Sequence, residues 1–223
     1  MFYSKEIWNM CVEFGLPLIY ASSAATYGDG SMGYTDSHEI VSKLQPLNPY
    51  GQSKNNFDAW AIAQKRQPYF WAGFKFFNVY GPGQGTDSNY AAVIPSFVEK
   101  IISGQSPTIF GDGSQSRDFV EVSDVVGLIL QILADGNDVQ NDVYNVATQT
   151  ETSILELLQL ISKSVKEINP SIPIPKVNYQ GKRSGDIDSS CASISKVKSA
   201  FGWQPKIDLK QGILSLVEYE LRS

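Results

Sequence analysis

Short apolar runs alternate with helical patterns along this chain of 223 residues, and that alternation constrains its fold more than any other feature. Three runs are apolar enough for buried strands and too short for helices: residues 18–21, 71–77 and 143–146. Helical spacing of apolar residues is found at about 1–14, 49–67, 93–103, 123–133, 195–200 and 209–221. Strands separated by helices form parallel sheets. The sequence therefore predicts an α/β fold built on a parallel sheet.

Local signals mark where two further helices begin. Ser123 is expected to cap the helix after it, because a seryl oxygen can accept from the first free amides of a helix. Thr152 and Ser153 are expected to cap another helix, with Glu156 in the capping-box position. The remaining segments are predicted as short strands at 108–110 and 117–120 and as loops at 28–48, 81–91 and 179–190.

Composition excludes several classes of protein. The formal net charge is −5, whereas binding to a phosphate backbone requires clustered Lys and Arg, so nucleic acid is not an expected partner. No apolar run approaches the ~20 residues of a membrane span, and residues 1–6 do not begin a signal peptide. Cys11 and Cys191 stand alone, without the neighbouring Cys or His of a zinc site, so no metal is expected. These features predict a cytoplasmic protein with no membrane partner.

One group of polar residues has the composition of a catalytic site. Ser22 and Ser23 follow the first apolar run, and Tyr50 and Lys54 come at the start of a predicted helix. Four residues along a helix place Tyr50 and Lys54 on one face, ~6 Å apart in rise. A tyrosine phenol is ordinarily too weak an acid to serve as a base near neutral pH, but an adjacent ammonium favours the phenolate. With a seryl hydroxyl on the same substrate oxygen, such a pair could take a proton from an alcohol whose carbon loses hydride.

On spacing alone, Tyr-x-x-x-Lys is more simply a surface helix with a packed tyrosine and a solvated lysine, because this chain has eleven tyrosines. The surrounding sequence is more specific. The blocks, in order, are YASSAATYGD (20–29), PLNPYGQSK (46–54), FKFFNVYGP (74–82), IFGDG (109–113), QSRDFV (115–120), YNV (144–146), RSGD (183–186) and FGWQP (201–205). In content, order and spacing they resemble the extended short-chain dehydrogenase/reductases of the NAD-dependent epimerase/dehydratase family. The resemblance spans nearly the whole chain.

The resemblance implies a catalytic triad of Ser23, Tyr50 and Lys54. Tyr50 would be the base, and Lys54 would both favour its phenolate and bind a ribose of the cofactor. The other residues implied on the cofactor side are Ser22, Phe77 and Val79, the last through its backbone. The implied cofactor is NAD or NADP, because the acidic residue that distinguishes their riboses would precede the first residue of this chain.

The resemblance also implies that the substrate is a nucleotide-diphosphate sugar. Arg117 and Arg183 match the cations that grip the diphosphate, a task that suits the forked donors of guanidinium. Asn78 matches a further diphosphate contact. The other implied substrate-binding residues are Val93, Asp186, Ile109 and Gly111, the last two lining the nucleoside. Without the resemblance, either arginine equally fits a surface ion pair.

Two lobes are implied. Residues 1–81 and 117–148 would form the dinucleotide-binding lobe, a partial Rossmann-like parallel sheet with helices on both faces. Residues 82–116 and 149–223 would form a smaller α/β lobe that binds the nucleotide sugar. The chain opens with a helix, whereas a doubly wound sheet opens with a strand and a glycine-rich turn. We therefore expect a truncated dinucleotide-binding lobe, weak dinucleotide binding and an exposed sheet edge.

Two parts of the chain resemble different members of the family. Residues 20–60 and 73–78 most resemble ADP-glycero-manno-heptose 6-epimerases, which usually carry a second base, a lysine, after the Gly-Pro turn. Here that place reads Thr86-Asp87-Ser88, and no lysine lies between Pro82 and Lys100. Residues 89–95 and 183–186 instead resemble UDP-hexose and UDP-N-acetylhexosamine 4-epimerases, whose keto intermediate rotates so that one base suffices. We therefore favour a UDP-hexose-type 4-epimerase, in carbohydrate metabolism such as lipopolysaccharide or polysaccharide biosynthesis.

Three other expectations stay open beside this one. A nucleotide-sugar dehydratase would need an Asp-Glu pair before the tyrosine, and this chain offers only Asp36 and the separated Glu39. An inactive truncated fragment or pairing partner would explain the missing opening strands. Family members often pair through the helix that bears the tyrosine, so the resemblance also implies a homodimer.

Overall fold

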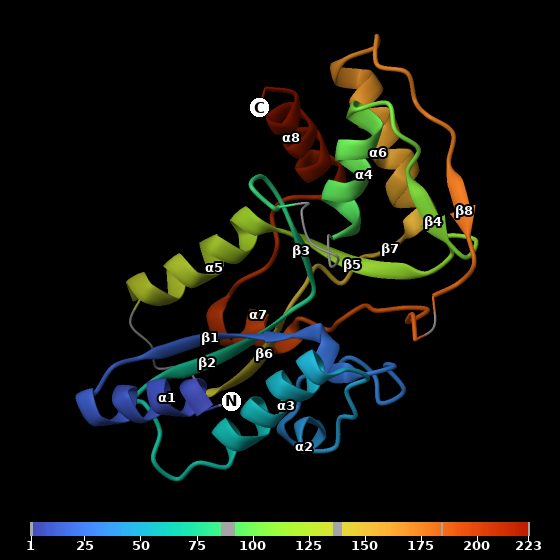
Figure 1. Ribbon diagram of the computed structural model, residues 1–223. Helices are drawn as coiled ribbons and strands as arrows, with labels where there is room; N and C mark the ends of the chain where they lie inside the picture. The colour runs from blue at the N-terminus through green and yellow to red at the C-terminus, as the bar shows by residue number, and fades with distance from the viewer. Residues whose placement is uncertain (1, 86–91, 136–139, 184, 223) are drawn as a thin grey trace. The chain divides into compact units, whose positions relative to one another are not determined.

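The computed structural model describes every residue except 1, 86–91, 136–139, 184 and 223 (Figure 1). The chain divides into two compact units: unit 1 comprises Met1–Phe77, Leu128–Gln149 and Cys191–Gln204, and unit 2 comprises Asn78–Gly127, Thr150–Ser190 and Pro205–Ser223. Their boundaries differ from those of the expected lobes, since 78–81 and 117–127 fall in unit 2 and 191–204 in unit 1. Which ligand each lobe binds stays a prediction.

Unit 1 is built on a parallel sheet of β1 (Leu18–Ser23), β2 (Trp71–Phe76) and β6 (Asp142–Val146), in the order β1-β2-β6 (Figure 1). Its other elements are α1 (Phe2–Phe14), the 3₁₀ helix η1 (Ala24–Tyr27), α2 (His38–Val41), α3 (Pro49–Ile62) and α7 (Ser195–Phe201). Trp8 of α1 and Phe57 of α3 pack in one core cluster with Trp71 of β2. Phe201 of α7 packs against Phe74, which points to the opposite face because side chains alternate along a strand. The expected parallel sheet with helices on both faces is confirmed.

Helix α3, which carries Tyr50 and Lys54, has clear signals at both ends. Pro49 stands at its first position, where the missing N–H has no intrahelical partner to lose. Asn48 caps the helix by accepting from the backbone N–H of Gly51 at 2.8 Å. The helix ends at Ile62 rather than near residue 67, and the chain then turns toward Pro68, which cannot continue a helix.

Unit 2 contains two small sheets. The strands β3 (Asn78–Tyr80), β5 (Ser116–Glu121) and β7 (Glu151–Ser153) are ordered β3-β5-β7, and β4 (Thr108–Phe110) pairs in parallel with β8 (Asn178–Gln180). Its helices are α4 (Val93–Ile102), α6 (Ile154–Ile168) and α8 (Leu209–Arg222), while α5 (Val122–Asp135) is divided between the units after Gly127. The core of unit 2 includes the fully buried side chains of Val98, Ile109 and Ile161.

Several local expectations were wrong. Helix α5 begins at Val122, so Ser123 lies inside it, and the carboxylate of Glu121 accepts from the N–H of Ser123 at 2.5 Å in place of the expected serine cap. The short helix α2 and most of strand β8 lie in segments that were expected to be loops, and strand β7 (Glu151–Ser153) was not predicted. The capping box of α6 is confirmed, since Ser153 and Glu156 exchange side-chain and backbone hydrogen bonds.

Two further observations concern ligands and membranes. Residues 28–33 read GDGSMG, which has the letter spacing of a dinucleotide turn, but they lie in turns after η1 and lead only to the four-residue helix α2. That segment is therefore not a strand–turn–helix phosphate loop. In the described part of the chain, no helix is both long enough and apolar enough to cross a bilayer.

Candidate active site

Tyr50 and Lys54 lie on one face of α3, as their spacing predicts. The Nζ of Lys54 lies 5.7 Å from the centroid of the Tyr50 ring. Lys54 also donates to the backbone oxygen of Ala21 at 2.7 Å, which fixes its ammonium at strand β1. The side chain of Tyr50 is 57% exposed, so its phenol can be reached from outside unit 1. The lysine of the pair is therefore held in place by a hydrogen bond, and the tyrosine is accessible to a ligand.

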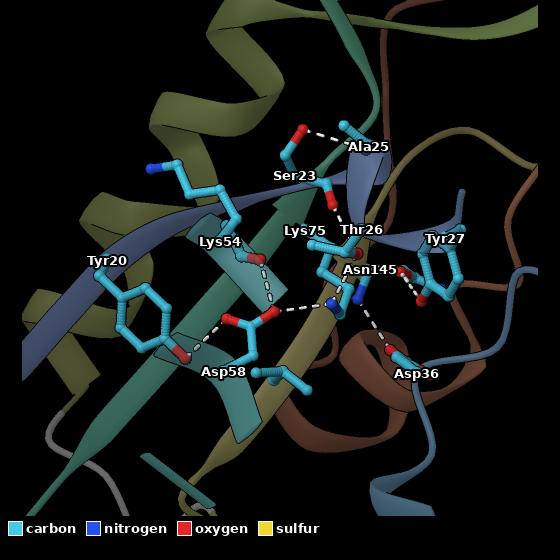
Figure 2. A network of polar contacts seen from close by, with 12 residues as sticks. Tyr20, Ser23, Ala25, Thr26, Tyr27, Asp36, Lys54, Asp58, Lys75 and Asn145 are labelled. Atoms are coloured by element: carbon cyan, nitrogen blue, oxygen red, sulfur yellow. Dashed lines mark hydrogen bonds and ion pairs between the residues drawn. The ribbon is translucent and has the colours of Figure 1, made fainter. Parts of the chain in front are cut away.

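Ser23 ends β1 and caps the 3₁₀ helix that follows. Its Oγ accepts from the N–H of Ala25 at 3.1 Å, and its backbone oxygen accepts from Thr26 Oγ1 at 2.8 Å (Figure 2). Helix α3 packs against this 3₁₀ helix. The close approach requires glycine at residue 51, where a Cβ would lie only 2.5 Å from the backbone oxygen of Ala25. Unit 1 thus brings together the segments that carry Ser23, Tyr50 and Lys54.

The residues expected to bind the cofactor differ in their exposure and in the hydrogen bonds that they already make. Ser22 is buried and donates its hydroxyl to Asp58 at 2.6 Å, so that hydroxyl is already committed within the protein. Phe77 is also buried, and Val79 belongs to strand β3 of unit 2. Lys54 fits a ribose better, because an ammonium has three donors and only one is used by Ala21. Lys54 and the exposed phenol of Tyr50 are therefore the residues of unit 1 suited to the ribose end of a dinucleotide.

Unit 2 contains a cavity of about 410 Å³ that gathers most of the predicted substrate residues. Those on its wall are Asn78, Val93, Arg117, Arg183 and Asp186. The guanidinium of Arg117 donates to Asp186 Oδ1 at 2.6 Å and to the backbone oxygen of Ser116 at 2.7 Å. The Cζ of Arg183 lies 3.7 Å from the centroid of the Phe110 ring. Both guanidinium groups are thus held in place at the wall of a cavity.

Two predicted residues do not line this cavity. Ile109 is fully buried in the core of unit 2, because the alternation along β4 turns its side chain away while Thr108 and Phe110 face the cavity. Gly111 adopts φ +74°, and its N–H donates to the backbone oxygen of Gln180 at 2.9 Å. Glycine is favoured at this position because the turn after β4 requires a positive φ.

The sequence analysis missed Lys100, Phe110 and Gln115, which also line the cavity. Lys100 lies seven residues after Val93, and that helical spacing places both on one face of α4. The signal was therefore present once Val93 had been assigned to the substrate. Within the described part of the chain, the side-chain ammonium of Lys100 has no hydrogen bond or ion pair, so its charge is available to a ligand.

A parallel sheet flanked by helices, with serine, tyrosine and lysine gathered near the end of a strand, defines the class of short-chain dehydrogenase/reductase-like α/β proteins. The comparison with protein families agrees. The chain belongs to the NAD dependent epimerase/dehydratase family, whose model matches residues 3–147. That description names NAD as the cofactor of the family.

Individual relatives differ in the sugar that their names give. The ADP-L-glycero-D-manno-heptose-6-epimerase of Fusobacterium nucleatum is 44% identical over 70% of this chain and 49% of its own length. A putative UDP-glucose 4-epimerase of Methanocaldococcus jannaschii is 34% identical over 91% of this chain and 62% of its own. The solved UDP-N-acetylglucosamine 4-epimerase of Methanobrevibacter ruminantium, in complex with UDP-N-acetylmuramic acid, is 29% identical with a TM-score of 0.79, covering 95% of this chain and 65% of that one. The chain spans about half the length of the heptose epimerases that it matches.

Proposed function

We propose that the protein containing this chain is a nucleotide-diphosphate-sugar epimerase that works by transient oxidation with NAD, of the UDP-hexose 4-epimerase type. The observation that carries the proposal is the cavity of unit 2, whose wall, among the described residues, presents Lys100, Arg117 and Arg183 with one acid, Asp186. Three cations against one acid favour an anion, and forked guanidinium groups suit a diphosphate. The ring of Phe110, already beside Arg183, adds a flat apolar surface of the kind a nucleobase uses.

Tyr50 and its neighbours supply the proton chemistry. The exposed phenolate oxygen of Tyr50 accepts the proton of the sugar hydroxyl, and the ammonium of Lys54 stabilises the phenolate. Bound NAD supplies the acceptor for the hydride that leaves the same carbon. Ser23 Oγ already accepts from Ala25, so its own proton remains free to donate to the sugar oxygen. Once the keto sugar has turned its other face, its carbon would regain the hydride and its oxygen would regain the proton held by Tyr50, which would complete the inversion.

The choice of sugar rests on the sequence around residues 82–100. The segment Thr86-Asp87-Ser88 lies outside the described residues, but the sequence has no lysine between Pro82 and Lys100 to act as a second base. A 4-epimerase needs only one base, and the Methanocaldococcus relative named for that reaction covers nine-tenths of the chain. These two facts favour a UDP-hexose substrate.

A heptose 6-epimerase is the second candidate, because the Fusobacterium relative has the higher identity over the part that it covers. A dehydratase has less support. Asp36 is buried and accepts from the N–H of Asn145 at 2.7 Å, so its carboxylate is not free to expel water. A homodimer stays a prediction of the resemblance, and a cytoplasmic location stays a prediction of the sequence composition.

The test is interconversion assayed with UDP-glucose, UDP-N-acetylglucosamine and ADP-heptose in the protein that contains this chain. We expect turnover of a UDP-hexose, and we expect Tyr50→Phe to lower it by at least ~100-fold, the usual worth of a general base. Tyr69→Phe is the matched control, since Tyr69 is also an exposed tyrosine of unit 1. Turnover of ADP-heptose alone would shift the assignment to the heptose reaction. An unchanged rate in Tyr50→Phe would refute the mechanism.

A further inference from the structure

Beneath the tyrosine–lysine pair, unit 1 encloses a second lysine paired with an aspartate. Lys75 of β2 donates to Asp58 of α3 at 2.7 Å, and both side chains are 0% exposed (Figure 2). Neither group can meet a ligand from that position. Their charges act only on other groups of the protein.

Asp58 receives two further donors from strand β1. The phenol of Tyr20 donates to Oδ1 at 3.0 Å, and the hydroxyl of Ser22 donates to Oδ2 at 2.6 Å. Ser22 and Lys75 are register partners across β1 and β2, and Tyr20 lies two residues before Ser22, so the donors of Asp58 come from one face of the sheet. The carboxylate of Asp58 therefore fastens helix α3 to both strands at once.

Lys75 extends the same network to the segment that carries Ser23. Its Nζ also donates to Thr26 Oγ1 at 2.8 Å, and it lies 5.3 Å from the centroid of the Tyr27 ring. Thr26 in turn donates its hydroxyl to the backbone oxygen of Ser23. One buried ammonium thus joins strand β2, helix α3 and the 3₁₀ helix η1.

Stability alone does not account for this pair. Burial lowers the pKa of Lys75 even with Asp58 beside it, so folding opposes the charge that the lysine carries. Replacing both members of a buried ion pair by uncharged groups of similar volume is often neutral or stabilising. The position of Asp58 on helix α3 suggests what the buried pair does. Asp58 lies four residues after Lys54 and eight after Tyr50, so all three lie along one side of α3.

We propose that Asp58 and Lys75 are positioning residues, which set where Tyr50 and Lys54 stand against the strand end that carries Ser23. The inference rests on the proposed function, because it assigns these two residues to the same proton transfer. Lys54 donates a hydrogen bond to Ala21 of strand β1. Asp58 accepts hydrogen bonds from Tyr20 and Ser22 of the same strand. Release of Asp58 therefore lets the helix shift along β1.

The test compares two lysine–aspartate pairs of unit 1. Lys75→Met breaks the pair with Asp58. Lys196→Met breaks the pair of Lys196 with Asp142, which stands at 2.5 Å, does not involve α3 and has a partly exposed lysine. We expect Lys75→Met to lower kcat by about 10- to 100-fold at an unchanged KM, the effect of a displacement near 1 Å. We expect Lys196→Met to lower kcat less than threefold. Lys75→Arg, which keeps charge and donors, is expected to recover most of kcat.

A second readout does not depend on turnover. Amide hydrogen exchange across residues 50–57 should quicken in Lys75→Met and stay unchanged in Lys196→Met. Each variant is measured under conditions equally far below its own unfolding midpoint. Should Lys75→Met fail to fold, the double variant Asp58→Asn with Lys75→Met removes both buried charges. We expect that variant to recover stability while kcat stays low.

The outcomes separate the two proposals. If Tyr50→Phe abolishes turnover but the double variant keeps full kcat, the positioning role is wrong and the proposed function stands. Equal losses of kcat in Lys75→Met and Lys196→Met would likewise overturn the positioning role. They would show that any destabilisation of unit 1 lowers kcat, whether or not α3 is affected. If Tyr50→Phe leaves turnover unchanged, the proposed function fails, and the exchange data still show whether the buried pair holds α3.

Discussion

The two units keep their charged groups in different places. Unit 1 encloses a lysine together with its aspartate, Lys75 with Asp58. Unit 2 also buries acids, but Asp124, for example, is satisfied by the backbone N–H groups of Lys206 and Ile207. The cations Arg117 and Arg183 of unit 2 instead stand on a cavity wall. Charges inside a core can only organise the protein, whereas charges on a wall can meet a ligand.

The largest expected effect tests that contrast directly. Lys75→Met should lower the free energy of unfolding by about 3–5 kcal/mol, because it leaves the carboxylate of Asp58 buried without its partner. Arg117→Met should cost at most about 1 kcal/mol, because its pair with Asp186 is partly open to solvent. Urea unfolding of each variant measures both values. Equal losses of unfolding free energy in the two variants would contradict the distinction between core charges and cavity-wall charges.

Ligand binding should show the opposite order. Arg117→Met should weaken binding of UDP to the chain by about 10- to 100-fold, since a hydrogen bond to a charged group contributes about 1.5–3 kcal/mol. Titration calorimetry with UDP measures this loss. Arg222→Met is the control, because Arg222 is an exposed arginine of unit 2 that pairs with Glu218, four residues earlier, and lies away from the cavity wall. A similar loss in that control would show that net charge, and not the cavity, governs binding.

Much of the fold could be predicted from the sequence because apolar periodicity is strong in the long elements. Helix α4 and strand β2 lie within one residue of their expected bounds, and helix α3 begins where it was expected. The polar strands β7 and β8 have three residues each and are mostly exposed, so they leave no periodic signal. The expected strand 71–77 was correct, but the next residues start β3, which pairs within unit 2. Pairing partners, unlike local patterns, depend on residues far along the chain.

The candidate site was predicted unevenly for a related reason. Spacing along a helix fixed Tyr50 and Lys54, and the resemblance pointed to the arginines of the cavity. The buried pair escaped notice, although a lysine between Phe74 and Phe76 in an apolar strand is itself a signal of a charge that needs a partner. That partner, Asp58, becomes evident only from the packing of α3 against the sheet.

A smaller effect is expected from two tyrosines, each of which lies against a glycine. A Cβ at Gly73 would lie 2.4 Å from the ring of Tyr20, and a Cβ at Gly212 would lie 2.1 Å from the hydroxyl of Tyr80. The hydroxyl of Tyr20 donates to Asp58, whereas that of Tyr80 is buried with no hydrogen-bond partner among the described residues. In unit 1 the half-buried phenol of Tyr20 therefore makes a hydrogen bond, whereas in unit 2 the buried phenol of Tyr80 has none among the described residues.

Tyr20→Phe should accordingly lower the free energy of unfolding by about 1–2 kcal/mol, because it removes a donor to a charged group. Tyr80→Phe should be neutral or stabilising by about 1 kcal/mol, because it removes a buried hydroxyl that has no partner. Both are measured by urea unfolding, and each variant serves as the control of the other. A loss in Tyr80→Phe as large as that in Tyr20→Phe would mean that its hydroxyl has a partner in solution.

The smallest effect is a pH dependence of opposite sign in the two units. Burial raises the pKa of Asp36 in unit 1 above its ordinary value of 3.8. The stability that Asp36 contributes is therefore present below that value and is lost as pH rises through its raised pKa. In unit 2, hydrogen bonds from the side chain and N–H of Ser153 lower the pKa of Glu156 below 4.5. Its contribution is present above 4.5 and is lost as pH falls through the lowered pKa.

Neutral variants isolate each contribution. Asp36→Asn keeps an oxygen that can accept from Asn145 but cannot ionise, so its stability relative to the parent chain should rise as pH increases above 3.8. Glu156→Gln should become less stable relative to the parent chain as pH rises toward 4.5, because only the parent gains the hydrogen-bonded carboxylate. Unfolding midpoints of the three chains at several pH values measure both slopes. Slopes of the same sign would show that burial does not dominate at Asp36, and that the interior of unit 1 accommodates charge as readily as the surface of unit 2.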